Sequence, residues 1–241
     1  MSDALTARQT QVLKSLIDEY IEIAEPVGSE NLEKKYNMGI SSATIRSEMC
    51  VLTKIGYLKQ PHTSAGRVPT PKAMKFYIDQ LMDERHMSLA DEVKVKENVM
   101  EGKNDVDRIL EEATHSLAQT TKSLAIGAVD DEDKLWHSGF ANIFNNPEFE
   151  DFRATASLFS FLDEAQRMHE LFFQRMTGTS PVEVIFGEEL GWPGFNPIGV
   201  VGTRFELLGR NCALGVIGPV RLPYPRVIPV MRYFRDVFEA L

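Results

Sequence analysis

The residues best suited to contact a ligand through short polar side chains lie together between Ser41 and Ser47. Arg46 carries a planar guanidinium whose N–H groups match the O6 and N7 acceptors of guanine in the major groove of DNA. Hydroxyl groups beside it can donate to a phosphate or to a base edge. The candidate set is Ser41, Ser42, Ala43, Thr44, Arg46 and Ser47. For Arg46 the alternatives are a phosphate contact or a solvated side chain. For the hydroxyls they are helix capping or simple exposure.

A second candidate set follows in a turn that contains glycine. His62, Thr63, Ser64 and Arg67 suit the DNA backbone or the minor groove, and we expect Gly66 to adopt the positive φ of a tight tip. The alternative is a hairpin that merely turns. Five lysines of the same region are candidate phosphate contacts, and each would otherwise be a solvated side chain: Lys34, Lys35, Lys59, Lys72 and Lys75.

A short helix would position the first set. Ser41 and Ser42 are good N-caps because a hydroxyl can accept a bond from an amide of the first turn, and Gly56 stands where a left-handed residue ends a helix. Apolar residues at helical spacing mark its buried side: Ile45, Met49 and Leu52. The opposite face carries Ala43, Arg46, Ser47, Cys50 and Lys54, with Ser42 at its edge. Strands over 57–60 and 67–69 would then form the hairpin.

Two helices are expected before this one, over 6–23 and 30–36. Three short helices followed by a hairpin are the arrangement of a winged helix, which places its third helix in a DNA groove. A further helix opens at Pro71 and closes the first domain near Met82. We therefore predict a winged helix-turn-helix domain over residues 1–82.

The rest of the chain mixes helices with short apolar runs. Residues 83–104 are charged and indicate a linker or a weak helix, and the apolar spacing predicts a helix over 105–124. Two short helices are expected within 149–176 and a last amphipathic helix over 227–241. Apolar runs bounded by glycine and proline indicate buried strands at 182–186, 198–201 and 212–217. The predicted fold class is α+β.

The charge is unevenly distributed. The net charge is −9 over 241 residues, but residues 26–80 carry 8 basic and 4 acidic side chains, whereas residues 81–241 carry 16 and 26. The basic excess coincides with the predicted helix and hairpin, and the acidic remainder would be repelled by phosphate. Two cysteines, no apolar leader and no run of about 18 apolar residues favour a cytoplasmic protein close to the nucleoid, without a membrane partner.

Nothing in the sequence indicates an enzyme. The five histidines and two cysteines show no metal-ligand spacing, and the acidic run that starts at Asp130 lacks the later glutamate of an EF-hand. The motifs GVVG at 199–202 and GVIG at 215–218 are not followed by the lysine of a phosphate loop. We predict no catalytic residue, no metal and no cofactor. The sequence leaves open whether the C-terminal half contains a small-molecule pocket.

Several motifs resemble a known family. The segments EPVGS (25–29), SSATIRSEM (41–49) and GYLKQPHTSAGRVPT (56–70), together with NNPEF (145–149) and GVIGPVRLPYPRVIPV (215–230), are similar to those of the heat-inducible transcription repressor HrcA family. The resemblance implies a winged helix followed by a GAF-like domain. It also implies a homodimer on double-stranded DNA, at an inverted-repeat operator ahead of chaperone genes, whose repression responds to heat through a chaperonin.

The chain departs from that family in three ways. Members are usually longer, with a domain inserted where 125–140 here spans the gap almost directly, so we expect the insertion and part of the sheet to be absent. Ser47 stands where asparagine is usual, and Ala73 where glycine is usual. The predicted organisation is a DNA-binding domain (1–82), a linker (83–104) and a reduced GAF-like regulatory and dimerisation domain (105–241).

The sequence thus predicts a sequence-specific repressor of heat-shock genes. Two alternatives stay open. One is a winged-helix regulator that senses a ligand in its C-terminal half, and the other is a winged helix used as a protein-interaction module without DNA binding.

Overall fold

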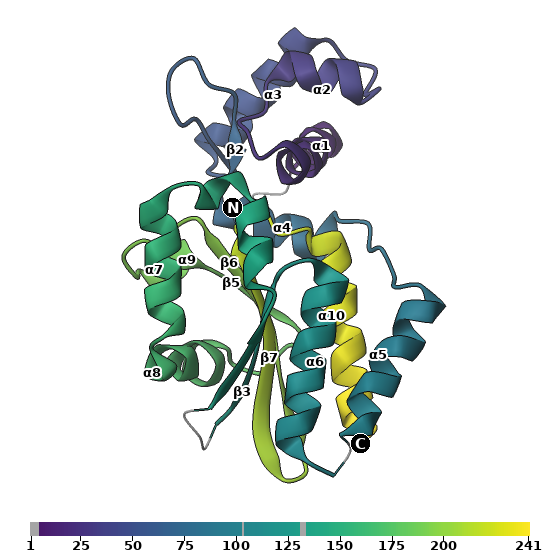
Figure 1. Ribbon diagram of the computed structural model, residues 1–241. Coiled ribbons are helices and arrows are strands. Elements are labelled where there is room, and N and C mark those ends of the chain that lie inside the picture. The colour runs from purple at the N-terminus through teal and green to yellow at the C-terminus, as the bar shows by residue number, and fades with distance from the viewer. Residues whose placement is uncertain (1–4, 103, 131–133) are drawn as a thin grey trace. The chain divides into compact units, whose positions relative to one another are not determined.

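The computed structural model describes residues 5–102, 104–130 and 134–241. The chain divides into two compact units, Met1–Asp83 and Glu84–Leu241, each of which has its own core. Figure 1 shows the course of the chain through both units.

The first unit contains four helices and a two-stranded hairpin. In order these are α1 (Ala7–Ile23), α2 (Ser29–Lys35), α3 (Ser42–Lys54), β1 (Leu58–Lys59), β2 (Val68–Pro69) and α4 (Pro71–Gln80). The two strands pair antiparallel, with Leu58 opposite Pro69. The first three helices bury a shared set of aliphatic side chains: Leu13, Leu16, Ile17, Leu32, Ile45 and Leu52. Burial of these aliphatic side chains makes the main contribution to the stability of such short helices.

The local signals that define α3 are confirmed. The Ser41 hydroxyl accepts a hydrogen bond from the amide of Thr44 at 3.3 Å, so Ser41 is the N-cap. Ile45, Met49 and Leu52 are its buried residues. Gly56 has a φ of +82°, the left-handed conformation expected just after the helix.

The second unit is built on a five-stranded antiparallel sheet with the order β4-β3-β7-β6-β5. Its strands are β3 (Leu124–Val129), β4 (Leu135–Ser138), β5 (Glu183–Phe186), β6 (Ile198–Leu207) and β7 (Arg210–Pro219). Its α-helices are α5 (Leu89–Glu101), α6 (Val106–Thr121), α7 (Phe152–Leu162), α8 (Ala165–His169), α9 (Gly187–Leu190) and α10 (Tyr224–Glu239). Two 3₁₀ segments, η1 (Phe140–Asn145) and η2 (Pro147–Phe149), and one π-helical turn, η3 (Glu170–Arg175), complete it.

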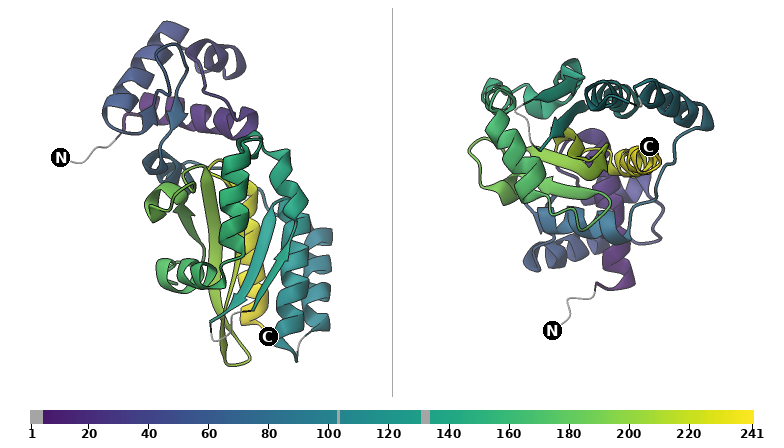
Figure 2. Two further views of the ribbon diagram at one scale, coloured as in Figure 1. Left: turned by 60° about the vertical axis from the view of Figure 1, so that its left-hand side comes forward. Right: turned by 90° about the horizontal axis from the view of Figure 1, so that it is seen from below.

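Helices cover both faces of this sheet (Figure 2). On one face α6 packs on β3 and β4, and α10 packs on β6, where the rings of Phe205 and Phe238 stack at 4.1 Å. The other face carries a hydrophobic core cluster, to which α7, α8 and η3 contribute Leu158, Phe161, Met168 and Phe172. The middle of the sheet is therefore buried on both sides, and its central strands β3 and β7 are almost uniformly buried rather than alternating.

Several predictions for this unit need correction. The strands at 183–186, 198–207 and 210–219 lie where apolar runs were predicted, but β6 and β7 are longer. The helix predicted over 105–124 ends at Thr121, because Lys122 adopts a left-handed φ of 56° and Leu124 begins β3. Strands β3 and β4 occupy the stretch in which part of the sheet was expected to be absent. For residues 83–104 the sequence left a linker and a weak helix open, and the structure has the helix: α5 fills most of this stretch and packs on α6, with Val95 and Val99 buried.

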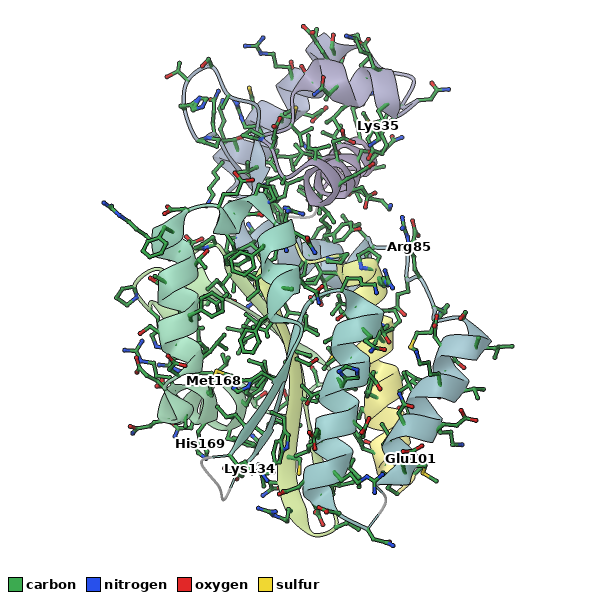
Figure 3. The ribbon with its side chains drawn as sticks, in the orientation of Figure 1. Lys35, Arg85, Glu101, Lys134, Met168 and His169 are labelled. Carbon is green, nitrogen blue, oxygen red and sulfur yellow. The ribbon has the colours of Figure 1, made fainter. Side chains whose placement is uncertain are left out.

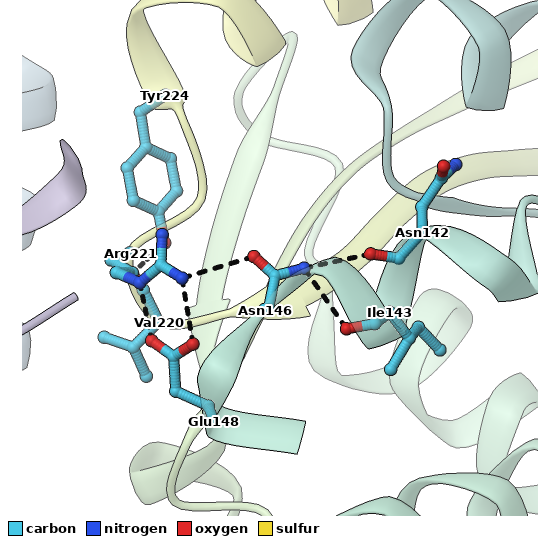
Figure 4. A network of polar contacts seen from close by, with 7 residues as sticks. All are labelled: Asn142, Ile143, Asn146, Glu148, Val220, Arg221 and Tyr224. Atoms are coloured by element: carbon cyan, nitrogen blue, oxygen red, sulfur yellow. Dashed lines mark hydrogen bonds and ion pairs between the residues drawn. The ribbon is translucent and has the colours of Figure 1, made fainter. Parts of the chain in front are cut away.

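A polar network joins the two motif segments of this unit (Figure 4). The guanidinium of Arg221 donates to both carboxylate oxygens of Glu148, at 2.6 and 3.0 Å, and to Asn146 Oδ1 at 3.3 Å. The amide of Asn146 in turn donates to the backbone carbonyls of Asn142 and Ile143. The side chains of Arg221 and Glu148 are only 11% and 20% exposed. A largely desolvated bidentate pair therefore fixes η2 to the loop between β7 and α10.

Candidate nucleic-acid interface

The predicted polar face of α3 lies on the surface of the first unit. Ala43, Arg46, Ser47, Cys50 and Lys54 are all exposed, and Ser42 and Thr44 are half-buried at the edge of this face. Arg46 makes no hydrogen bond or ion pair with any residue that the structure describes. Its guanidinium is therefore available to an external acceptor.

The hydroxyls on this helix are partly committed to the helix itself. Ser41 caps α3 and lies 3.1 Å from the hydroxyl of Thr44. Ser47 donates to the carbonyl of Ala43 at 3.1 Å. A hydroxyl that donates once still offers lone pairs as an acceptor, so Ser47 keeps the capacity to bind an N–H group.

The hairpin tip is exposed at His62, Thr63 and Ser64. Gln60, which was not among the predicted site residues, holds the tip in place. The amide of Gln60 donates to the carbonyls of Thr63 and Ala65, both at 2.9 Å. A glutamine just before a turn is too common for its role to be predicted from the sequence.

The prediction that Gly66 has a positive φ is wrong, although the structure does require a glycine at this position. Gly66 does not adopt a positive φ, but a Cβ on it would lie 2.3 Å from the carbonyl oxygen of Val27. At this point Val27 and Arg67 form an antiparallel bridge, with each amide donating to the carbonyl of the other at 2.9 Å. Glycine is needed for the close approach of two backbones rather than for a turn.

Arg67 is half-buried and turned toward α3. Its Nε donates to the hydroxyl of Thr53 at 3.1 Å, and Nη1 lies 3.4 and 3.5 Å from the carbonyls of Gly66 and Ala65. Thr53 donates in turn to the carbonyl of Met49 at 2.7 Å. Arg67 thus connects the hairpin with the last turns of α3.

The five predicted phosphate lysines differ in their surroundings. All are exposed. Lys35, labelled in Figure 3, forms ion pairs with Glu19 and Glu22 at 2.7 and 2.6 Å, and the hydrogen bonds that it donates to these carboxylates raise its pKa. Because Glu19 is 6% exposed, Lys35 neutralises a buried carboxylate. Lys72 donates to the carbonyl of Ile55 and lies over the ring of Tyr57 at 4.3 Å. Lys34 makes no such hydrogen bond or ion pair with the residues that the structure describes.

The described residues contain neither a candidate metal site nor a membrane-spanning helix. Among the described residues no group of three or more histidines, cysteines or acidic residues lies close enough to hold a metal ion. No helix in the described part of the chain is long and apolar enough to cross a membrane. His169, labelled in Figure 3, lies 2.8 Å from the carboxylate of Asp130.

A surface feature that the sequence analysis missed is a group of aromatic rings on η1 and α7. Phe140, Phe144 and Phe152 are 39%, 61% and 83% exposed. The rings of Phe140 and Phe144 lie about Phe159, with centroids 6.0 and 6.2 Å away. In sequence these residues look like core, because periodicity does not show which face of a helix is covered.

The second unit also carries the family signal. The family model described as the HrcA protein C terminal domain matches residues 72–228, which is more than half of the chain. The chain belongs to the HrcA family. The matched range runs from α4 to α10 and includes the Arg221–Glu148 network.

Individual relatives extend this similarity to the N-terminal unit. The heat-inducible transcription repressor HrcA of Acetivibrio thermocellus is 39% identical over 128 residues, which cover 53% of this chain and 36% of that protein. The repressor of the same name from Moorella thermoacetica is 23% identical over 333 aligned positions, which cover 96% of each. Since this alignment is longer than the 241 residues of the chain, the Moorella protein carries segments without a counterpart here. The HrcA family is one of transcription repressors and not of enzymes.

A solved structure shares the fold. A crystal structure of a hypothetical protein superposes with a TM-score of 0.75 at 19% identity, covering 98% of both chains. At this identity the similarity concerns the fold alone. The arrangement of helices, hairpin and antiparallel sheet described above therefore recurs in a protein of distant sequence.

Proposed function

We propose that this chain is a winged-helix transcription repressor that binds an inverted-repeat operator as a homodimer and controls heat-shock genes. The observation that carries the proposal is the free face of α3. It exposes Arg46, Ser47 and Ala43 on a helix whose other side is anchored in the core. A helix with small residues and one uncommitted arginine on its outer face can enter a major groove.

The hairpin supports the same assignment. In a winged helix the segment after the recognition helix lies along the DNA backbone, and here that segment exposes His62, Thr63 and Ser64 at its tip. We assign Arg46 to base readout, and the hairpin tip with Lys34, Lys59 and Lys75 to phosphates. Lys35 and Lys72 contribute to the potential near the DNA, although their primary contacts are within the fold.

Dimerisation follows from the strength of such a contact. Residues 26–80 carry four more basic than acidic side chains, which is too few for tight binding by one domain at physiological salt. A second copy on the other half-site binds with a high effective concentration. We assign pairing and regulation to the second unit, as a reduced GAF-like domain, and place the protein in the cytoplasm near the nucleoid.

The regulatory signal is proposed from the relatives. Proteins named heat-inducible transcription repressor align with nearly the whole chain, and this supports heat as the signal and chaperone genes as the targets. A chaperonin is the partner that would transmit that signal. Release of the operator on warming, and its recovery when chaperonin is added, would test this part.

The central experiment is titration of the protein with a duplex taken from the DNA upstream of its own gene, followed by fluorescence anisotropy. We expect salt-dependent, sequence-selective binding that Arg46→Ala weakens by about 10- to 100-fold. Arg153→Ala is the matched control, because Arg153 is an exposed arginine in the acidic second unit. Equal binding by the wild type and Arg46→Ala, or no preference for any duplex, would favour a protein-interaction module.

A further inference from the structure

We propose that Arg67 and Thr53 form a positioning pair that holds the hairpin at a fixed angle to α3, and that Arg67 does not itself contact DNA. This inference rests on the proposed function above, since it concerns how the two DNA-facing elements are held together. It reassigns a residue that the sequence alone places among the DNA contacts.

The hydrogen bonds between the two residues have consistent donors and acceptors. A threonine hydroxyl has one hydrogen and two lone pairs. Thr53 uses its hydrogen toward the carbonyl of Met49 at 2.7 Å and accepts from Arg67 Nε at 3.1 Å. The chain of bonds runs from Arg67, the residue just before β2, to the backbone of α3. Because Nε is the atom nearest the stem of the guanidinium, this bond fixes the plane of the whole group.

The backbone of Arg67 is fixed as well. It exchanges two hydrogen bonds of 2.9 Å with Val27, in the connection between α1 and α2. The lack of a side chain on Gly66 is what allows this approach. One residue therefore ties the hairpin to the α1–α2 connection through its backbone and to α3 through its side chain.

The root of the hairpin is held to the end of α3 by further bonds. Thr70 donates to the carbonyl of Gly56 at 2.8 Å, and Lys72 donates to that of Ile55 at 3.0 Å. By contrast, the hydrogen bonds of the tip, among the described residues, join groups within the turn itself. The bonds are concentrated where they set the angle of the hairpin, and the tip is left to meet a partner.

A fixed angle matters because α3 and the tip must reach a groove and the adjacent backbone at the same time. If the hairpin were free, its ordering would oppose binding. A positioning residue and a phosphate contact can be told apart, because each phosphate neutralised by a cation contributes about 0.9 to the slope of log K against log salt. A residue that only positions others lowers affinity and leaves this slope unchanged.

The test is a set of salt titrations of operator binding by the full-length chain. Thr53→Val removes the hydroxyl and keeps the shape, and Arg67→Lys keeps the charge but removes Nε–H. We expect each to weaken binding about 3- to 10-fold at an unchanged slope. The variant with both changes should bind the operator as tightly as the single variant of lower affinity, because both changes break the same hydrogen bond. Lys34→Ala, at an exposed lysine of α2, is the control for a phosphate contact and should lower the slope by about 0.9.

Circular dichroism and thermal unfolding establish that each variant is folded before its affinity is compared. Arg67→Gln is a second variant that removes the charge and retains a side chain able to donate to Thr53; we expect it to keep the wild-type slope. The inference is overturned if Arg67→Lys and Thr53→Val bind like the wild type while Arg67→Gln lowers the slope. Failure of the wild type to bind any duplex would instead overturn the proposed function, and this inference with it.

Discussion

Helices α3 and α10 are both amphipathic, yet they use their sides differently. Of 13 residues, α3 buries Ile45, Met49 and Leu52 and leaves a broad polar face in solvent. Of 16 residues, α10 buries nine, and its Phe238 stacks on the sheet. Helix α3 is held in the core by a narrow apolar stripe and exposes its other side chains to solvent. Helix α10 buries more than half of its residues in the core of the second unit. Under the proposed function, DNA binding is assigned to α3, whereas the buried residues of α10 stabilise the second unit.

The largest effect is expected when a buried aromatic side chain of α10 is truncated, and this change tests the difference between the two helices. Phe234 is fully buried, so Phe234→Ala should lower the free energy of unfolding of the second unit by about 3–5 kcal/mol. Arg46→Ala on α3 should change stability by less than about 0.5 kcal/mol. Denaturant unfolding followed by circular dichroism measures both. Similar values for the two variants would mean that the helices do not differ in the way proposed.

The next effect concerns polar groups that the second unit has buried. Glu148→Ala leaves the largely covered guanidinium of Arg221 without its carboxylate, and we expect a loss of about 2–4 kcal/mol. Glu164→Ala is the matched control, since it breaks an ion pair with Arg167 whose side chains are 45% and 43% exposed. That change should cost less than about 1 kcal/mol. Equal costs would show that burial of the first pair is unimportant.

A smaller effect is expected where α6 meets the sheet. A Cβ on Gly127 would lie 2.7 Å from the hydroxyl oxygen of Thr114, so Gly127→Ala should destabilise the unit by about 1–3 kcal/mol. Thr114 is buried, and its hydroxyl has no hydrogen-bond partner among the described residues. Thr114→Ala should therefore restore much of the loss in the double variant, as thermal unfolding would reveal. Simple additivity of the two changes would contradict this close packing.

The smallest effect is a pH dependence at the edge of the sheet. Burial lowers the pKa of His137, which packs beside the ring of Phe140, although Asp163 opposes the shift. The folded state thus binds this proton less readily than the unfolded state, so its contribution is complete above a pH of about 6.5 and is lost as the pH falls below that value. Stability measured between pH 7.5 and 5.5 should fall more steeply for the wild type than for His137→Asn. Both histidines have an exposed surface, but of the two only His137 has a ring contact among the described residues, so His86→Asn should follow the wild type.

Much of the first unit could be predicted because its signals are local. The serine cap, the apolar stripe and Gly56 of α3 lie within 16 residues of sequence, and each is where the pattern placed it. The sequence could not show which residues distant along the chain come into contact in the folded unit. The partners of Lys35, Arg67 and Lys72 lie 13 to 17 residues away and are ordinary surface residue types in the sequence. The proposed roles in DNA binding stay predictions for all of these residues.

The second unit was harder to predict because its sheet is buried on both faces. Uniformly apolar strands such as β3 have no alternation to distinguish them from helix, so Leu124 was assigned to the helix before it. Helix α5 was obscured by its charges, since only Val95 and Val99 are buried. The longer runs near 198 and 212 were found because glycine and proline bound them.

The chain has two cysteines, and they differ completely in environment: Cys212 is buried in β7, and Cys50 is exposed on the outer face of α3. A maleimide dye added to the native protein should therefore couple at a single place, one turn from Arg46. Its emission would report directly on whether that surface is covered. The molecule thus comes with a built-in attachment point for watching operator occupancy in real time, without any engineered change.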